Sequence, residues 1–319
     1  MAVFTEVPFA EAAALLIQLG AGKLERLEGI RSGIENTNYF ADTTERRLVI
    51  TVFERLGRSE LPFYLELMQH TARRGLPVPC PVAAPTGELL HTLSGKPAAV
   101  TPRLPGAPIE EPSSAQRDSL ANTLAKLHLA GRDYARTQPS TRGLTFWQKN
   151  APWLGPRLSE PARALLATEL AFQEQLAAEA AYQALPRGAI HGDLFRDNVL
   201  FDGPTLSGLL DFYFAATDTF LYDIAVCLND WCIQSDGELS HDRAEAFVAA
   251  YERERPLQEE ERALLPALLR AAAFRFWVSR LMDIHKPRDA SLLQPRDPSQ
   301  YERLLRRRIA APWTPRGAA

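Results

Sequence analysis

The chain has 319 residues, enough for one large domain or two lobes, and its 46% hydrophobic content can bury a substantial core, which excludes global disorder. The formal net charge of −3 argues against a nucleic-acid-binding or membrane-surface protein, because either would show an excess of basic residues. The 3 cysteines form no C-x-x-C pair, so they indicate neither a zinc site nor a disulfide framework. The first residues carry no basic leader and no apolar run is long enough to span a membrane, so we expect a cytoplasmic protein.

The N-terminal part of the chain reads as a short helix followed by strands. Apolar residues recur at helical spacing over 8–19, and strands are predicted at 24–30 and 47–53. Between them a polar turn containing Gly33 leads into another strand, and backbone amides in such a turn can close over phosphate groups. A protein kinase presents a lysine to the phosphates from its third strand, whereas Thr51 takes that place here. Arg55 or Lys96 could supply the charge instead.

A helix over 61–74 follows, and it leads to two short apolar runs near 88–90 and 98–101. The next segment, Pro102-Arg103-Leu104-Pro105-Gly106, has the proline and glycine content of a connector between lobes. We therefore predict an N-terminal lobe over 1–106 and a C-terminal lobe over 107–319.

The rest of the chain is predicted to be mainly helical. Helices are expected at 114–131, 160–185, 224–233, 241–254, 259–286 and 298–309. The aromatic stretch 141–156 reads as a loop. His128, near the end of the first of these helices, is interpreted as a packed structural histidine rather than a ligand.

The stretch that carries chemistry runs from 189 to 214. His191-Gly192-Asp193-Leu194 is followed by Asn198, and a second acid, Asp211, lies beyond a predicted hairpin of strands over 199–201 and 206–212. Phosphoryl transfer from ATP needs one carboxylate to accept the proton of the attacking hydroxyl. It also needs an amide oxygen and a second carboxylate to hold Mg²⁺ against the phosphate oxygens. Asp193 is therefore the predicted base, and Asn198 and Asp211 are the predicted metal ligands.

Asp223 immediately precedes the helix predicted at 224–233. In that position it can cap the helix or brace the catalytic loop. His191 is likewise expected to support the loop.

The catalytic loop, Leu210-Asp211-Phe212 and Tyr222-Asp223-Ile224-Ala225 together resemble the aminoglycoside-phosphotransferase-like small-molecule kinases, which include choline and methylthioribose kinases. More narrowly, the segments Glu35-Asn36-Thr37-Asn38-Tyr39-Phe40, Asp211-Phe212-Tyr213-Phe214-Ala215 and Asn229-Asp230-Trp231-Cys232 are similar to those of bacterial homoserine kinases built on this fold. The resemblance covers about 1 to 312. It implies an α+β, bilobal protein-kinase-like fold, with a small antiparallel-sheet lobe followed by a larger, mainly helical lobe.

The resemblance also implies an activity, namely ATP-dependent phosphorylation of the side-chain hydroxyl of L-homoserine to O-phospho-L-homoserine, on the route to threonine. ATP and Mg²⁺ are the implied cofactors and L-homoserine is the small-molecule substrate, with neither nucleic acid nor membrane as a partner. The implied nucleotide-binding positions are Gly33, Asn36, Thr37, Asn38, Thr51 and Arg103.

Homoserine carries an α-carboxylate and an α-ammonium, so its pocket needs a cation and an acid. Arg275 and Arg280 lie on an otherwise apolar helix, and their spacing does not let both face one ligand, so one is expected to pair with a protein acid. Asp230 is the candidate for the ammonium, with Asp218 as the alternative. The remaining substrate candidates are Tyr213 and Trp231.

Two alternative functions stay open. The chain could phosphorylate another small alcohol, such as choline, an aminoglycoside or methylthioribose; choline would call for an aromatic cage, for which Tyr213, Trp231 and Trp277 are available. It could also be a nucleotide-binding pseudokinase that serves as a scaffold. Thr51 supports that interpretation, while the intact Asp193, Asn198 and Asp211 oppose it.

Overall fold

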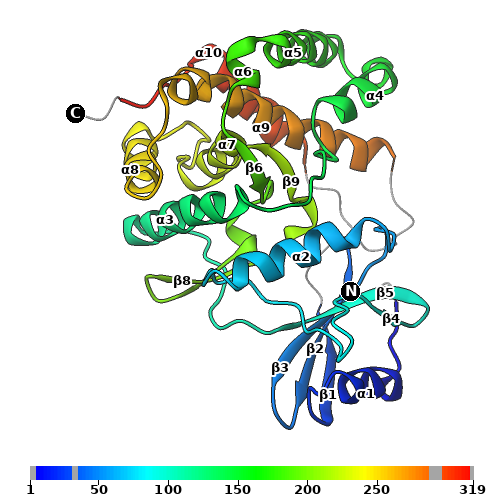
Figure 1. Ribbon diagram of the computed structural model, residues 1–319. Coiled ribbons are helices and arrows are strands. Elements are labelled where there is room, and N and C mark those ends of the chain that lie inside the picture. Colours follow the sequence, from blue (N-terminus) through cyan, green and yellow to red (C-terminus); the bar gives the residue numbers. More distant parts are fainter. Residues whose placement is uncertain (1–4, 31–34, 287–296, 317–319) are drawn as a thin grey trace. The chain divides into compact units, whose positions relative to one another are not determined.

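The computed structural model describes residues 5–30, 35–286 and 297–316. The chain divides into two compact units, and Figure 1 labels their elements. The first unit holds the described residues up to Gly106 together with Ser207–Leu210, and the second holds Ala107–Leu206 and the described residues from Asp211 onward. Within the described part of the chain, no helix is both long and apolar enough to cross a membrane.

The first unit is built on a five-stranded antiparallel sheet with the strand order β1-β2-β3-β5-β4. Its strands are β1 (Leu24–Gly29), β2 (Thr37–Thr43), β3 (Arg47–Val52), β4 (His91–Leu93) and β5 (Lys96–Pro102), and its helices are α1 (Phe9–Gln18) and α2 (Leu61–Ala72). The helices and strands predicted at 8–19, 24–30, 47–53 and 61–74 are confirmed. The apolar run near 88–90 is not a strand, since β4 begins only at His91.

One face of this sheet packs against α1. Strand residues such as Tyr39, Ile50 and Val100 form a buried cluster with Leu15 and Leu16 of the helix. Because side chains alternate along a strand, the residues between them point to the opposite face, which carries Asn38, Phe40 and Thr51. The sheet therefore has an apolar face covered by α1 and a second, more polar face.

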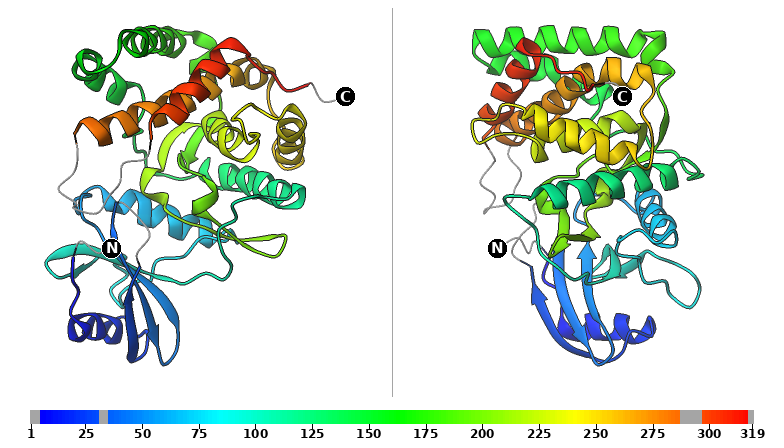
Figure 2. Two further views of the ribbon diagram at one scale, coloured as in Figure 1. Left: turned by 180° about the vertical axis from the view of Figure 1, so that it is seen from behind. Right: turned by 90° about the vertical axis from the view of Figure 1, so that its left-hand side faces the viewer.

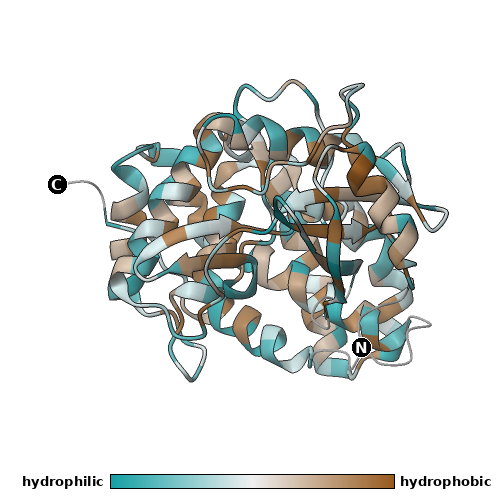
Figure 3. Cartoon of the chain, turned by 90° about the horizontal axis from the view of Figure 1, so that it is seen from below, coloured by the Kyte–Doolittle hydropathy of each residue, from teal (hydrophilic) through white to brown (hydrophobic). Residues whose placement is uncertain are grey.

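The second unit is mainly helical, which confirms the expected fold class. Its helices are α3 (Ser114–Gly131), α4 (Leu144–Leu154), α5 (Glu160–Ala178), α6 (Ala180–Gln183), α7 (Phe220–Trp231), α8 (His241–Glu252), α9 (Glu259–His285) and α10 (Ser299–Ala310). Figure 2 shows α10 running alongside α9, and Figure 3 shows hydrophobic and hydrophilic stretches sharing the same helices, as burial of one side requires.

Two predictions in this unit are wrong. The stretch 141–156 is not a loop, because it contains α4, which keeps Pro152 inside the helix. Trp147 of this helix is buried, and its ring meets that of Phe274 at a centroid distance of 5.1 Å. The helix predicted over 160–185 is broken at Glu179, whose backbone is extended with φ −71° and ψ 133°.

Short strands surround the predicted catalytic loop. The hairpin is confirmed as β7 (Val199–Asp202) and β8 (Thr205–Leu209), although its second strand ends before Asp211. A second pair, β6 (Arg187–Ile190) with β9 (Ala216–Thr219), is antiparallel and was not predicted, since four residues are too few to show an alternating pattern. This second pair decides which groups meet at the loop.

Candidate active site

The β6–β9 pair brings together the two parts of the sequence that form the site. β6 runs directly into the loop at His191, and β9 runs directly into α7, with Ile190 opposite Ala216 in the register. The first turn of α7 therefore lies against the start of the catalytic loop. The catalytic loop and the side chains that contact it in the next paragraphs belong to the second unit.

Gly192 is required at its position in the loop. Its φ is +77°, in the left-handed region, and a Cβ built there would lie 2.7 Å from the backbone oxygen of Phe214. Both the dihedral and the space favour glycine. This explains why the loop reads His-Gly-Asp rather than the His-Arg-Asp of protein kinases.

Asp223 anchors the loop through its backbone amides. Its Oδ2 accepts a hydrogen bond from the amide of His191 at 2.7 Å, and its Oδ1 accepts one from the amide of Gly192 at 2.6 Å. Asp223 lies in the first turn of α7 and does not cap it, because the N-cap is Thr219, whose hydroxyl accepts from the amide of Leu221. The expected position just before the helix is wrong, and the contacts of the carboxylate are those of a brace.

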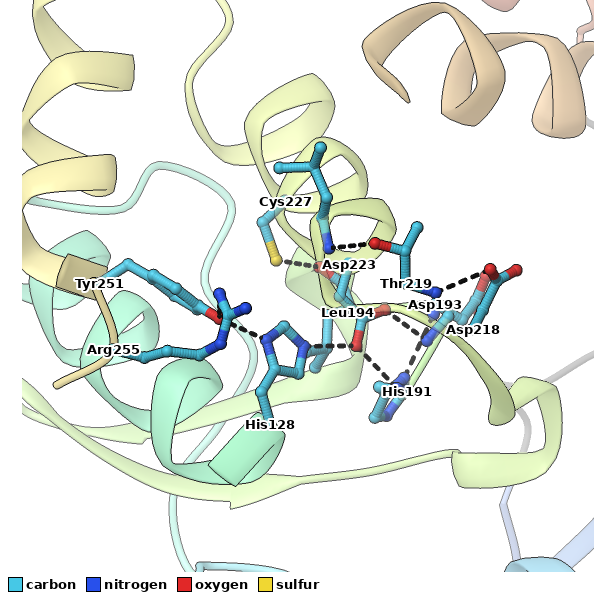
Figure 4. Close-up of polar contacts among 12 residues, drawn as sticks. His128, His191, Asp193, Leu194, Asp218, Thr219, Asp223, Cys227, Tyr251 and Arg255 are labelled. Atoms are coloured by element: carbon cyan, nitrogen blue, oxygen red, sulfur yellow. Dashed lines mark hydrogen bonds and ion pairs between the residues drawn. The ribbon is translucent and has the colours of Figure 1, made fainter. Parts of the chain in front are cut away.

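A buried polar chain extends from Asp223 away from the loop (Figure 4). His128 Nε2 lies 3.2 Å from Asp223 Oδ2, His128 Nδ1 lies 2.7 Å from the hydroxyl of Tyr251, and Arg255 donates to that hydroxyl at 3.1 Å. Arg255 also pairs with the buried Glu261 at 2.9 Å. His128 is completely buried and serves the packing role expected of it, with polar partners that the sequence did not reveal.

Burial and hydrogen bonding determine the protonation states of His128 and Asp223 in this row of polar side chains. It lowers the pKa of His128 below the ordinary value, because the cationic form is costly in an apolar surrounding, and the hydrogen bond to Asp223 only partly opposes this. Burial alone would raise the pKa of Asp223, but the hydrogen bonds from His128 and the His191 amide outweigh it, so the pKa lies below the ordinary value. The pair is therefore a neutral imidazole beside a carboxylate.

Asp193 is held at both of its carboxylate oxygens. Oδ1 accepts from Nη1 of Arg275 at 3.0 Å, and Oδ2 accepts from Nδ2 of Asn198 at 3.2 Å. Asn198 Nδ2 also donates to the backbone oxygen of Asp193 at 2.7 Å, while the Asp193 amide donates to His191 Nδ1 at 3.2 Å. The predicted base and one predicted metal ligand thus lie in direct contact.

Asp211 has an unusual backbone conformation for a residue other than glycine. Its φ is 59° and its ψ is 60°, and the short 3₁₀ turn Phe212–Phe214 follows it. A left-handed residue that is not glycine costs roughly 1–2 kcal/mol, and such strain is concentrated at functional sites. The strained position coincides with the acid expected at the exit of the hairpin.

The donor atoms suit a hard divalent cation. Asn198 commits its amide nitrogen to Asp193, which turns the amide oxygen the other way, and Asp211 adds a carboxylate. Oxygen donors of this kind are the ones that Mg²⁺ prefers, and it keeps several waters besides. Among the described residues, no group of three or more His, Cys, Asp or Glu side chains is placed so that it could hold a metal ion.

Several substrate candidates already have protein partners. Asp230 pairs with Arg196 at 3.1 Å and also accepts from the Arg196 amide at 2.9 Å, which ties α7 to the catalytic loop. Trp231 is buried, and its indole donates to the backbone oxygen of Leu194 at 2.9 Å. These contacts place both residues behind the loop as supports.

Two further candidates are engaged elsewhere. Arg280 donates to the backbone oxygen of Asp297 and to Gln300, and its guanidinium lies 4.1 Å from the ring centre of Tyr301. Asp218, the alternative acid, pairs with Arg187 at 2.9 Å. Tyr213 lies in the short turn after Asp211, beside the predicted metal position in sequence.

The nucleotide-binding candidates lie in the first unit, on both faces of its sheet. On the face opposite α1, the hydroxyl of Thr51 donates to Asn38 Oδ1 at 2.8 Å, and the guanidinium of Arg103 lies 3.9 Å from the ring centre of Phe40. Thr37 points to the other face, where its hydroxyl donates to Glu54 at 2.6 Å. Asn36 is buried at the start of β2, and Gly33 lies outside the described residues.

Contacts in the first unit also show where the two cations lie that could replace the third-strand lysine of protein kinases. Lys96 Nζ contacts Glu54 at 2.5 Å and the hydroxyl of Thr5 at 2.9 Å, and its position in the β5 register places it on the α1 side. Arg55 instead lies 3.7 Å from Glu35, next to the predicted phosphate turn. Arg55 is therefore the better placed of the two cations that the sequence offered.

A loop that presents a carboxylate beside an amide, with a second carboxylate at a strained turn and a sheet-based unit before it, defines a phosphotransferase of the protein-kinase-like class. The model of the phosphotransferase enzyme family matches residues 26–257. A homoserine kinase from Polaromonas naphthalenivorans is 55% identical, with 98% of this chain and 99% of that protein covered. A homoserine kinase from Cupriavidus pinatubonensis is 48% identical, with 97% of each chain covered.

The chain therefore belongs to the homoserine kinases within the phosphotransferase enzyme family, and the resemblance seen in the sequence is confirmed. Among solved structures, an amicoumacin kinase matches 93% of this chain and 92% of its own with a TM-score of 0.69 at 14% identity. That likeness confirms the protein-kinase-like fold.

Proposed function

We propose that this chain transfers the γ-phosphoryl group of ATP to the side-chain hydroxyl of L-homoserine, giving O-phospho-L-homoserine and ADP. The observation that carries the proposal is the 55% identity to a homoserine kinase over nearly the whole length of both chains. The product is the one expected on the route to threonine.

In this reaction the substrate oxygen bonds to the γ-phosphorus as the bond to the β,γ-bridging oxygen of ATP breaks. Asp193 accepts the hydroxyl proton, and Asn198 and Asp211 hold Mg²⁺ through their side-chain oxygens. When bound, the metal neutralises charge on the phosphate oxygens, which supplies much of the rate in phosphoryl transfer. The amicoumacin kinase of this fold was solved with AMP-PNP and Ca²⁺, which supports a divalent cation at the nucleotide.

Nucleotide contacts are proposed for the sheet of the first unit. Asn38, Thr51 and Arg103 lie on its polar face, and Asn36 and Thr37 are the further candidates beside them; Gly33, from the same prediction, lies outside the described residues. Arg55 supplies the charge that a strand lysine provides in protein kinases. No part of the substrate pocket is assigned to Asp230, Trp231 or Arg280, because their contacts are structural.

Burial of two aromatic side chains disfavours one competing activity, the phosphorylation of choline. A choline-binding cage from Trp231 and Trp277 is not available, since 1% and 0% of their surfaces are exposed. The test is a panel of L-homoserine, choline, methylthioribose and an aminoglycoside, each incubated with ATP and Mg²⁺, with products identified by mass.

We expect O-phosphohomoserine with a kcat/KM at least a hundredfold above that of the other alcohols. Efficient phosphorylation of a different alcohol would overturn the substrate assignment. Absence of metal-dependent ATP turnover with every alcohol would favour the scaffold instead.

A further inference from the structure

Arg275 lies in the apolar middle of α9, and it has no role in the phosphoryl transfer proposed above. Only 4% of its surface is exposed. Its Nη1 donates to the backbone oxygen of Gly192 at 2.8 Å and to Asp193 Oδ1 at 3.0 Å. A buried charge is costly unless it is paired, and here the partner is the predicted base itself.

The surroundings of the guanidinium fix its plane. Its central carbon lies 4.1 Å from the ring centre of Phe276 and 5.1 Å from that of Phe214, which follows Asp211 in the chain. Lysine is a poor substitute for a planar cation that stacks on aromatic rings and donates to two acceptors. The group therefore links α9, the catalytic loop and the turn after Asp211.

We propose that Arg275 is a positioning residue for the base: it anchors Asp193 Oδ1 and leaves Oδ2 as the oxygen that accepts the hydroxyl proton. The inference rests on the proposed function of Asp193. Oδ1 is held by the cationic guanidinium at 3.0 Å, whereas Oδ2 accepts a longer hydrogen bond, of 3.2 Å, from the neutral amide of Asn198. As the phosphoryl group is transferred, the O–H bond of the substrate breaks and an O–H bond forms at Oδ2.

This role differs from recognition of the homoserine carboxylate, which the sequence also allowed for Arg275. The charge of the guanidinium is already neutralised by Asp193, and its buried position leaves little surface for a second anion. The two roles predict different kinetics. A positioning residue acts on kcat, whereas a carboxylate ligand acts on substrate affinity.

The test uses Arg275→Lys and Arg275→Ala in the full chain. For each variant, kcat is measured with ATP, Mg²⁺ and homoserine, and the Kd of homoserine is measured by calorimetry with AMP-PNP and Mg²⁺ present. We expect kcat to fall about 10- to 100-fold in both variants, as loss of a charge-assisted hydrogen bond predicts, while the Kd of homoserine changes less than threefold. Methylguanidine should restore part of kcat in Arg275→Ala.

A second comparison asks whether the effect passes through the base. In an Asp193→Asn background, Arg275→Lys should lower kcat by less than threefold, because the interaction that it disrupts is already gone. Arg270→Lys is the matched control: Arg270 also lies on α9, pairs with Glu169 at 2.6 Å and stacks 3.5 Å from the ring centre of Phe172. That control should lose stability without losing kcat.

A tenfold or larger rise in the Kd of homoserine with kcat preserved would overturn the proposal and assign Arg275 to the carboxylate. A variant that stays unfolded even with methylguanidine would also overturn it, since the residue would then be structural only. If the wild type phosphorylates some other alcohol, the proposed function fails while this inference is still tested on that alcohol, because it concerns the base rather than the substrate.

Discussion

Replacing Asp223 by asparagine keeps the shape of the side chain and removes its charge. In the native protein one oxygen accepts from the Gly192 amide at 2.6 Å, and the other accepts from the His191 amide at 2.7 Å and faces His128 at 3.2 Å. Asparagine has only one side-chain oxygen. It keeps more contacts if that oxygen faces the His191 amide and His128. Its NH₂ then meets the N–H of Gly192, and two donors face each other in a buried site.

The cost follows from these contacts. An unsatisfied buried donor costs about 1–3 kcal/mol, and the remaining bonds lose the added strength that an ionised acceptor gives. We expect Asp223→Asn to lower the free energy of unfolding by about 2–5 kcal/mol and to lower kcat at least tenfold, because the loop that carries Asp193 loses an anchor. Urea unfolding and steady-state kinetics, both at pH 7.5, measure the two effects.

Asp118→Asn is the matched control. Asp118 forms an exposed pair with Arg253 at 3.4 Å, and such pairs contribute about 0–1 kcal/mol. The control should therefore keep both stability and kcat. An Asp223→Asn protein as stable and as active as the control would refute the anchoring role drawn here for the buried carboxylate.

Four further outcomes are expected. Gly192→Ala should lower stability by more than the roughly 1 kcal/mol of Gly203→Ala, since both glycines have positive φ but only a Cβ at Gly192 meets backbone; equal losses would show that space is not limiting. Asp193→Asn should lower kcat by about 10²–10⁴-fold with the Kd of ATP unchanged, and near-normal turnover would remove its role as base. Asp211→Ala should abolish Mg²⁺-dependent nucleotide binding, measured by calorimetry against the exposed Asp202→Ala; wild-type affinity for MgATP would exclude it as a metal ligand. Because burial lowers the pKa of His128, the folded state favours neutral imidazole, so stability is full above about pH 6.5 and declines as pH falls below that value. Between pH 6.5 and 5, the free energy of unfolding should fall more steeply for the wild type than for His128→Gln, by up to about 1.4 kcal/mol per pH unit. Equal pH dependence of the two proteins would contradict a buried, neutral His128.

A single sequence offers candidates for the chemistry of the site more readily than for its support. Asp193, Asn198 and Asp211 were predicted because phosphoryl transfer needs particular residue types at short spacings along one stretch. The partners of the loop come instead from distant helices, such as His128 on α3 and Arg275 on α9. Arg275 and Arg280 in a mostly apolar helix indicated a partner of negative charge, either a protein acid or the substrate, but no pattern in one sequence says which.

The errors in secondary structure have a similar origin. The aromatic stretch 141–156 was read as a loop, yet it contains α4, in which Trp147 packs against Phe274 of the distant helix α9. The β6–β9 pair escaped prediction because strands of four residues are too short to show an alternating pattern. Both elements have partners that are distant in the sequence.

The catalytic loop is held from three directions, and each contact has a cost. Asp223 binds its amides, Arg275 binds the Gly192 carbonyl and Asp193, and Asp230 binds Arg196. Asp223 and Arg275 are ionised groups that little water reaches, and such buried charges contribute little net stability compared with apolar packing, whereas Arg196 keeps 34% of its side chain exposed. Phosphoryl transfer depends on positioning more than on covalent chemistry, so a loop that is already rigid before substrate arrives loses less entropy on reaching the transition state.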